Sequence, residues 1–372
     1  MKKVAIMICR VITLNLILLF AAVSCTCKRV ESEIEEVFTK PVDSLTLERS
    51  GSLSWALDEQ SVPQIKSSFF DADAEILYVF NEITWELDSY CITTGERIKG
   101  QKMRIRPWSM NIVSADSIYV LDLDHSRIVR LNASGKVVDS VNIEERSTIL
   151  PGGTGQPYII SDNLLAYVSS HTRLQQTSFV VDARTSEMDS YLKYPEIFED
   201  FYGVMLMQVP YSAYNPQEKR LIVGFAPESC VYVLDMDTRS IERFHTESVF
   251  YREIKPLRKG RWGYGVSSSE EIEYFRANTT YANILYDEYR NLYYRIVEIA
   301  TPMPGVTLTN KAKKLSVIIM DAGFKKIGES VIEDNVISSF RYTCFVSEDG
   351  LNLQLLTSED EMSFTTYKVV AE

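Results

Sequence analysis

The feature that most constrains the fold of this chain is a unit of short alternating strands that recurs along residues 51–372. Two stretches show it clearly, residues 76–80 with 85–92 and residues 117–121 with 127–131. Apolar and polar side chains alternate in these runs, and Gly, Asn, Asp and Ser stand between them, which is typical of antiparallel hairpins. Comparable units follow at residues 164–192, 220–246, 315–331 and 342–369.

The spacing of the turns predicts a single all-β domain built as a β-propeller. The central turns fall near residues 95, 135, 185, 238 and 322. A repeat of roughly 40–50 residues with about four strands is typical of a propeller blade, because one such sheet cannot bury both of its faces alone. With strands near residues 52–70 completing the ring, the length predicts six or seven four-stranded blades. The wide step before residue 322 leaves room for the seventh.

One segment and the domain boundaries complete the fold prediction. Residues 287–300 fit a strand or a partial helix, and their Tyr, Ile and Val content favours a strand. No Gly/Ser-rich or Pro-rich linker divides residues 51–372, so we expect one domain there.

The N-terminus predicts export and lipid anchoring. Three basic residues lie among the first ten, and an apolar stretch runs from Val11 to Ala22. This stretch is shorter than the roughly 20 residues that span a bilayer, so residues 1–24 are typical of a signal peptide. The small residues before Cys25 predict that Cys25 is lipidated and that residues 25–50 form a tether. A plain secretory signal with an incidental cysteine is the alternative.

The composition excludes several classes of function. The formal charge of −12 disfavours a nucleic-acid partner, because an acidic surface repels phosphate. The chain has three histidines and lacks P-loop, zinc and catalytic-serine motifs, so we expect no metal and no cofactor. Cys91, Cys230 and Cys344 stand in apolar runs without metal-ligand spacing, which favours buried free thiols.

Two pairs of aspartates resemble the start of a calcium loop. They are Asp122 with Asp124 and Asp235 with Asp237. Neither pair is followed by the Gly at position six and the Glu at position twelve that an EF-hand loop requires. We therefore interpret both pairs as hairpin-turn residues.

The sharpest candidate for ligand or partner binding is the tyrosine- and arginine-rich segment at residues 286–295. Tyrosine rings and arginine fork donors are frequent in recognition surfaces, where arginine can bind carboxylates or phosphates. The alternative is a blade strand whose tyrosines pack between sheets and whose arginines pair with Asp287 and Glu288. The candidate binding residues are Tyr286, Tyr289, Arg290, Tyr293, Tyr294 and Arg295.

Several blocks of sequence together resemble a family of Bacteroidota lipoproteins. They are residues 77–81 with 87–90, residues 117–121, residues 287–295 and residues 317–329, beside the lipobox-like residues 22–25. The family carries a domain of unknown function classed with TolB-like six-bladed propellers. The resemblance implies a propeller and an outer-membrane address, which Thr26 after the cysteine also favours, and it supplies no activity and no catalytic residues.

Three functions are compatible with these observations. The first is a non-enzymatic binding or interaction scaffold for a protein partner or a small ligand such as a glycan or peptide. The second is a hydrolase or lyase that uses carboxylates or tyrosines in the central funnel. The third is a structural subunit of an envelope complex. The absence of a catalytic motif favours the first, held at the outer membrane by its lipid, with the face of that membrane left open.

We predict that Cys25→Ala moves the protein from the membrane fraction to the soluble fraction. Each buried CH₂ of an acyl chain contributes about 0.8 kcal/mol, so a protein that loses its chains also loses its anchor. Fractionation of cells labelled with palmitate measures both properties. Cys27→Ala is the matched control and should stay labelled and membrane-bound; a labelled Cys25→Ala variant would contradict lipidation at this residue.

Overall fold

The computed structural model describes residues 35–37 and 45–371 of this 372-residue chain, apart from short internal gaps. The predicted signal peptide and Cys25 lie outside the described residues. Residues Glu35–Glu372 form one compact unit. The gaps are residues 58, 62–64, 66, 115, 144–156, 162, 172–175, 199–206, 208–209, 256, 258–267, 302–312, 337–342, 356–357 and 359.

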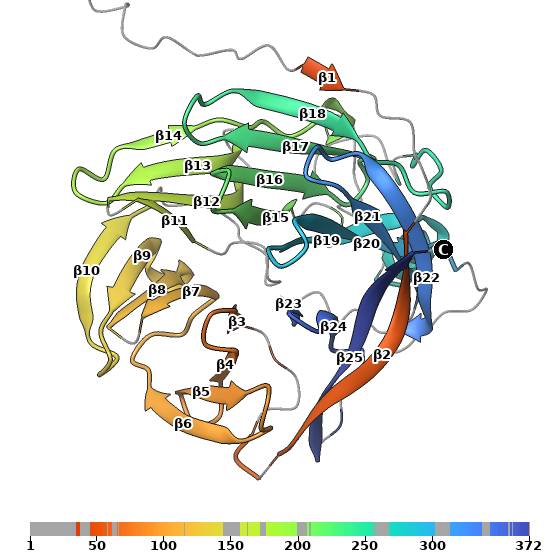
Figure 1. The fold of residues 1–372 in the computed structure, drawn as a ribbon. Helices are drawn as coiled ribbons and strands as arrows, with labels where there is room; N and C mark the ends of the chain where they lie inside the picture. The colour runs from red at the N-terminus through yellow and green to blue at the C-terminus, as the bar shows by residue number, and fades with distance from the viewer. Residues whose placement is uncertain are drawn as a thin grey trace, which may run out of the picture. The chain divides into compact units, whose positions relative to one another are not determined.

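Within this unit six sheets follow one another around a ring, which confirms the predicted β-propeller and sets the blade number at six (Figure 1). Each blade contains four antiparallel strands, as the hairpin pattern predicts, and in blades 1 to 5 these four strands follow one another in sequence. Blade 1 contains β3 (Ser68–Asp71), β4 (Ile76–Asn81), β5 (Glu86–Cys91) and β6 (Arg97–Lys102); blade 2 contains β7 (Ser109–Ser114), β8 (Ser117–Asp122), β9 (Arg127–Leu131) and β10 (Val137–Asn142); blade 3 contains β11 (Tyr158–Ser161), β12 (Leu164–His171), β13 (Gln176–Asp182) and β14 (Met188–Ser190).

The second half of the ring has one extra edge strand and one composite blade. A short strand, β1 (Glu35–Val37), pairs in parallel with the edge of blade 4. Blade 6 takes its fourth strand from the N-terminal side of the chain. Blade 4 contains β15 (Pro210–Asn215), β16 (Arg220–Phe225), β17 (Cys230–Asp235) and β18 (Ile241–His245); blade 5 contains β19 (Thr280–Asp287), β20 (Leu292–Ile299), β21 (Lys313–Met320) and β22 (Lys326–Val336); blade 6 contains β23 (Cys344–Ser347), β24 (Gly350–Leu353), β25 (Glu361–Ala371) and β2 (Leu45–Ala56).

The ring closes through β2, the first strand of the six blades, and β25, the last one. Their antiparallel register runs from the pair Leu45 with Ala371 to the pair Ala56 with Glu361. At one end of β2 the Leu47 N–H donates to Ser330 Oγ of blade 5 at 2.8 Å. β2 therefore completes blade 6 and also contacts blade 5. It begins at Leu45, before the boundary expected at residue 51.

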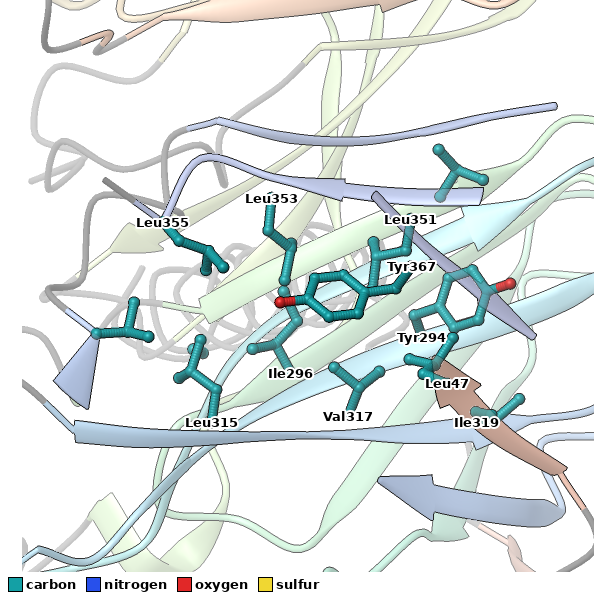
Figure 2. Close-up of a cluster of buried hydrophobic side chains, with 13 residues drawn as sticks. Leu47, Tyr294, Ile296, Leu315, Val317, Ile319, Leu351, Leu353, Leu355 and Tyr367 are labelled. Carbon is teal, nitrogen blue, oxygen red and sulfur yellow. The ribbon is translucent and has the colours of Figure 1, made fainter. Parts of the chain in front are cut away.

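The core consists of six apolar layers, each between two neighbouring blades. Strand alternation supplies them, because successive side chains point to opposite faces. In β9, Val129 and Leu131 join the layer shared with blade 1, and Ile128 joins the layer shared with blade 3. Figure 2 shows the layer between blades 5 and 6, where Val317 of β21 lies in one cluster with Leu351 of β24.

Many of the hairpin turns share one local device. The Asp235 Oδ1 accepts the N–H groups of Asp237 and Thr238 at 2.9 and 2.7 Å, and Arg239 then adopts a positive φ of 64°. Asp and Asn suit this role because their side chains cap the backbone two and three residues on. The two aspartates are thus turn residues, as predicted. The same device begins at Asn81, Asp182, Asn215 and Asp287, and ends in positive φ at Trp85, Ser186, Lys219 and Asn291.

The five predicted turns separate the third and fourth strands of blades 1 to 5. Blade 6 has no such turn, since its third and fourth strands, β25 and β2, come from opposite ends of the chain. The wide step before residue 322 holds helix α3 (Ser268–Ala277) rather than a seventh blade. Two short 3-10 helices, Leu123–His125 and Glu196–Phe198, lie in connections. Residues 292–299 form a strand, as their composition favours.

The expectation of buried free thiols is met in part in the described residues. Cys91, Cys230 and Cys344 are free, but only Cys230 is fully buried, and Cys91 and Cys344 are half-buried. Asp122 accepts from His125 Nδ1 at 2.9 Å and from Arg127 Nε at 2.8 Å, so it serves a turn. No helix among these residues is long and apolar enough to cross a membrane.

We predict that Trp55→Ala lowers the free energy of unfolding by about 3–5 kcal/mol, the usual loss for a buried Trp. Trp55 is 2% exposed, and its ring packs against Phe364 of blade 6 and Tyr90 of blade 1. Chemical denaturation measures the loss. The control is Trp85→Ala, where the ring is 46% exposed and a loss of about 1 kcal/mol or less is expected. Equal losses would show that β2 does not contribute specially to closure.

Candidate functional site

The predicted tyrosine–arginine segment forms the first hairpin of blade 5. It begins at the end of β19, turns at residues 288–291 and continues into β20. The turn is fixed by Asp287, whose Oδ1 accepts the N–H groups of Tyr289 and Arg290 at 3.0 Å each. Strand alternation then sends the side chains of β20 to different neighbours. The six candidate residues therefore divide into a buried group and an exposed group.

Tyr293 and Tyr294 are fully buried on opposite faces of β20. Tyr293 lies in the layer with blade 4, where its hydroxyl accepts from Asn215 Nδ2 at 2.9 Å and its ring stacks on Phe324. Tyr294 lies in the layer with blade 6 and donates to Asp287 Oδ2 at 2.6 Å. Burial raises the pKa of both phenols, so they stay neutral. Their contacts are internal, which supports the packing alternative for these two residues.

Arg295 is fully buried between blades 4 and 5. Its guanidinium carbon lies 3.6 Å from the centre of the Tyr281 ring, a cation–π contact. Its Nε donates to the Tyr211 hydroxyl at 2.9 Å, and its terminal nitrogens donate mainly to backbone carbonyls of blade 4. These donors are used internally, so Arg295 joins two blades. The remaining acceptors are Glu228 O, Ser229 O, Cys230 O, Thr246 O and Thr246 Oγ1.

The exposed group joins the inner turns of several blades. Tyr289 is 39% exposed, and its hydroxyl donates to the Ala72 carbonyl in the first turn of blade 1 at 3.4 Å. Arg290 pairs with Asp287 at 3.1 Å and donates to the Glu348 carbonyl of blade 6. Tyr286 donates to Gln217 of blade 4 at 3.4 Å. Tyr289 is therefore exposed, whereas Tyr286 and Arg290 are half-buried, and all three lie on turns that converge.

The surroundings of this exposed group are acidic. Desolvation raises the pKa of Glu288, and the nearby charges of Asp73, Asp287 and Asp71 raise it further. Desolvation and the acidic neighbours, Glu288 first, raise the pKa of Tyr289 to about 12. Arg290 is already neutralised by Asp287. An anionic ligand, which the sequence suggested for these arginines, is therefore disfavoured at this turn. Among the described residues no group of His, Cys, Asp and Glu is arranged to hold a metal ion.

A pocket of about 240 Å³ lies elsewhere, between blades 2 and 3. Its apolar walls continue the interblade layer through Ile128, Val141 and Leu165. At the pocket, polar side chains stand in place of the apolar ones that fill the rest of the layer between blades 2 and 3. The other lining residues are Tyr119, Arg130, Asp139, Ser140, Asn163, Ala183 and Arg184.

The polar groups of this pocket make few contacts within the described part of the chain. Arg130 Nε is buried and has no hydrogen-bond partner among the described residues. Buried donors are normally paired, because an unpaired one loses its bond to water without a replacement. Asp139 accepts only the N–H of the next residue, Ser140, among the described residues. Arg184 lies 3.7 Å from Asp182 and is largely exposed. The pocket therefore offers donors and an acceptor to a small polar molecule.

Sequence reasoning missed this pocket, although one signal was available. In β9 the alternation assigns Ile128 and Arg130 to the same face, the one that packs on blade 3. An arginine on an interblade face is a signal, because the six layers are mainly apolar; another case is the fully buried Arg295 between blades 4 and 5. The sequence does not show that Asn163 and Arg184 lie near Arg130, because those two residues belong to blade 3 and Arg130 belongs to blade 2.

Comparisons with known proteins agree with the fold. The family model described as a domain of unknown function (DUF4221) matches residues 105–331. The crystal structure of a DUF4221 family member from Bacteroides vulgatus ATCC 8482 shares 22% identity at a TM-score of 0.71, over 89% of this chain and 99% of that chain. A protein from Bacteroides fragilis NCTC 9343 shares 10% identity at a TM-score of 0.51, over 91% and 100% of the two chains. At these identities the similarities show the fold alone, and no curated protein matches the chain.

We predict that Arg295→Met lowers the free energy of unfolding by about 3 kcal/mol or more, because it leaves several buried acceptors of blade 4 unpaired. Arg295→Lys should give a smaller loss, since lysine keeps the charge but has fewer donors. Denaturant titration measures both. Arg49→Met is the matched control: Arg49 is 64% exposed and should cost about 1 kcal/mol or less. A loss at Arg295 no larger than at Arg49 would remove its assigned role between the blades.

Proposed function

We propose that this chain, which belongs to the DUF4221 family, a domain of unknown function, is a non-enzymatic binding protein whose ligand enters the pocket between blades 2 and 3. We further propose that it works at the outer membrane, anchored through Cys25. A signal sequence followed by a candidate lipidation cysteine supports this address. The binding role goes beyond what the family membership establishes.

The observation that carries the binding role is the set of unused polar groups in the pocket. Among the described residues Arg130 Nε is a buried donor without an acceptor, and it lies beside the apolar layer between blades 2 and 3. Small-ligand sites typically combine apolar walls with a few convergent polar groups. The volume of about 240 Å³ is smaller than the roughly 300–1,000 Å³ of drug-sized sites, so it favours a small ligand.

The turn at residues 288–291 of blade 5 supports a contact with a partner protein at the surface, and not a second ligand pocket. Tyr286, Tyr289 and Arg290 lie on converging turns, where an acidic surface would suit a basic partner protein. This role stays a prediction for these three residues.

The alternative function is that of a hydrolase or lyase acting in the central funnel. The raised pKa of Glu288 supports this alternative. A raised carboxyl pKa suits a general acid, and two aspartates lie near. The pocket with unused donors lies elsewhere, between blades 2 and 3, so binding is the better-supported function.

A thermal-shift screen of the full chain tests the proposal, with monosaccharides, amino acids and inorganic phosphate as probes. A ligand that binds only the folded protein adds about 2.7 kcal/mol at a hundredfold excess over its Kd. We expect at least one class of probe to raise the melting temperature. Ala183→Phe should abolish that rise, because Ala183 lines the pocket and a phenyl ring would fill it.

The matched control is Ala56→Phe, at the exposed end of β2, which should keep the shift. Each variant is first melted without probe, so that loss of fold is separated from loss of binding. A shift that survives in Ala183→Phe would place the binding site outside this pocket. A flat response to every probe class would contradict a small-ligand role.

A further inference from the structure

Three ionisable or polar side chains form one row across blade 2. Tyr119 of β8 is the register partner of Arg130 of β9, and Arg130 is the register partner of Asp139 of β10. Side chains directly opposite one another on paired strands share a face, with Cβ atoms about 4.5–5.5 Å apart. All three line the pocket. A phenol, a guanidinium and a carboxylate are therefore presented side by side at its wall.

The charges in this row are close but are not paired with each other. No carboxylate of the described residues lies within ion-pair distance of Arg130, although Asp139 stands beside it in the sheet. Other cross-strand arginines of the ring behave differently. Arg127 in the same strand binds Asp122 at 2.8 Å, and Arg97 in blade 1 binds Asp88 at 2.6 Å. Arg130 and Asp139 thus keep a positive and a negative group separately available.

The rest of the pocket limits the ligand. A simple anion would meet Arg130 and also the negative charge of Asp139. A neutral sugar would leave the half-buried Arg130 guanidinium, whose Nε is buried, without a charged partner, and charged acceptors make the stronger hydrogen bonds. A zwitterion satisfies both groups at once. Ile128, Val141 and Leu165 also line the pocket, but each is at most 3% exposed, because the layer between blades 2 and 3 already covers most of its surface.

We infer that the ligand of this pocket is a free α-amino acid, with its carboxylate on Arg130 and its ammonium on Asp139. The inference rests on the proposed function, because it names the ligand class of the same pocket. Arg184 and the Asn163 amide, both on blade 3, line the opposite wall and are placed to add donors. Both blades would then contact one small molecule.

Calorimetric titration of the full chain with L-valine and L-leucine tests the inference. Two analogues remove one charge each: isovalerate lacks the ammonium and valinamide lacks the carboxylate. We expect the amino acids to bind at least tenfold more tightly than either analogue. Arg130→Gln should weaken amino-acid binding at least tenfold, whereas the matched control Arg49→Gln, on the exposed face of β2, should leave it unchanged.

A charge-removal variant makes the test specific. Asp139→Asn should weaken binding of L-valine at least tenfold and should strengthen binding of isovalerate, because the negative charge that repels the anion is gone. Asp139 is exposed, so this variant is expected to fold. Equal effects of Asp139→Asn on the two compounds would overturn the assigned pose.

The outcomes separate the two proposals. A monosaccharide or phosphate that binds, and is lost in Ala183→Phe, would keep the pocket and overturn the amino-acid assignment. Failure of amino acids, sugars and phosphate alike would overturn both. Amino-acid binding that survives both Arg130→Gln and Ala183→Phe would show a site elsewhere and would also overturn the assignment.

Discussion

The fold depends on one constraint: both faces of every four-stranded sheet must be covered. An isolated blade would leave two apolar faces in water, so blades are stable only as neighbours. The six apolar layers between blades meet this need, and none of them can be omitted. The pairing of β2 with β25 makes the arrangement circular, because it completes blade 6 between blades 5 and 1. The capped turns connect the strands of the sheets that stack in this closed ring.

The layers are built to the same plan but differ in their polar content. Between blades 4 and 5, the Arg295 guanidinium contacts the Tyr281 ring and donates to the Tyr211 hydroxyl and to several backbone carbonyls. These contacts offset the free-energy cost of burying its charge. Between blades 2 and 3, Arg130 lies on a comparable interblade face, and its Nε has no acceptor among the described residues. The two arginines thus differ in their internal partners: those of Arg295 make it structural, and their absence at Arg130 Nε is the basis of the ligand site that we propose.

Much of the fold could be predicted from the sequence because its signals are local. Turn residues near positions 95, 135, 185, 238 and 322 mark hairpins whatever the rest of the chain does, and each proved to be a turn. The blade number was harder, because α3 widens one step of the repeat.

The candidate site was less accessible to sequence reasoning. Tyr293 and Arg295 are residue types that are frequent in recognition surfaces. Both are nevertheless buried, because they pack against blade 4, which lies far away in the sequence. The pocket likewise needs two blades, and no local pattern joins Arg130 to Asn163.

The closing strand pair also sets an order of events. Leu45 of β2 can pair with Ala371 only after β25 has been synthesised, so the first strand of the six blades waits for the last one. Contacts between such distant residues form slowly, and unpaired edges exposed in the meantime favour aggregation. Blades 1 to 5 can each form their hairpins as they emerge, yet the faces that flank blade 6 stay open. A chain that ends before β25 would therefore leave these faces open to proteases and chaperones. Only a chain that includes β25 can close the ring.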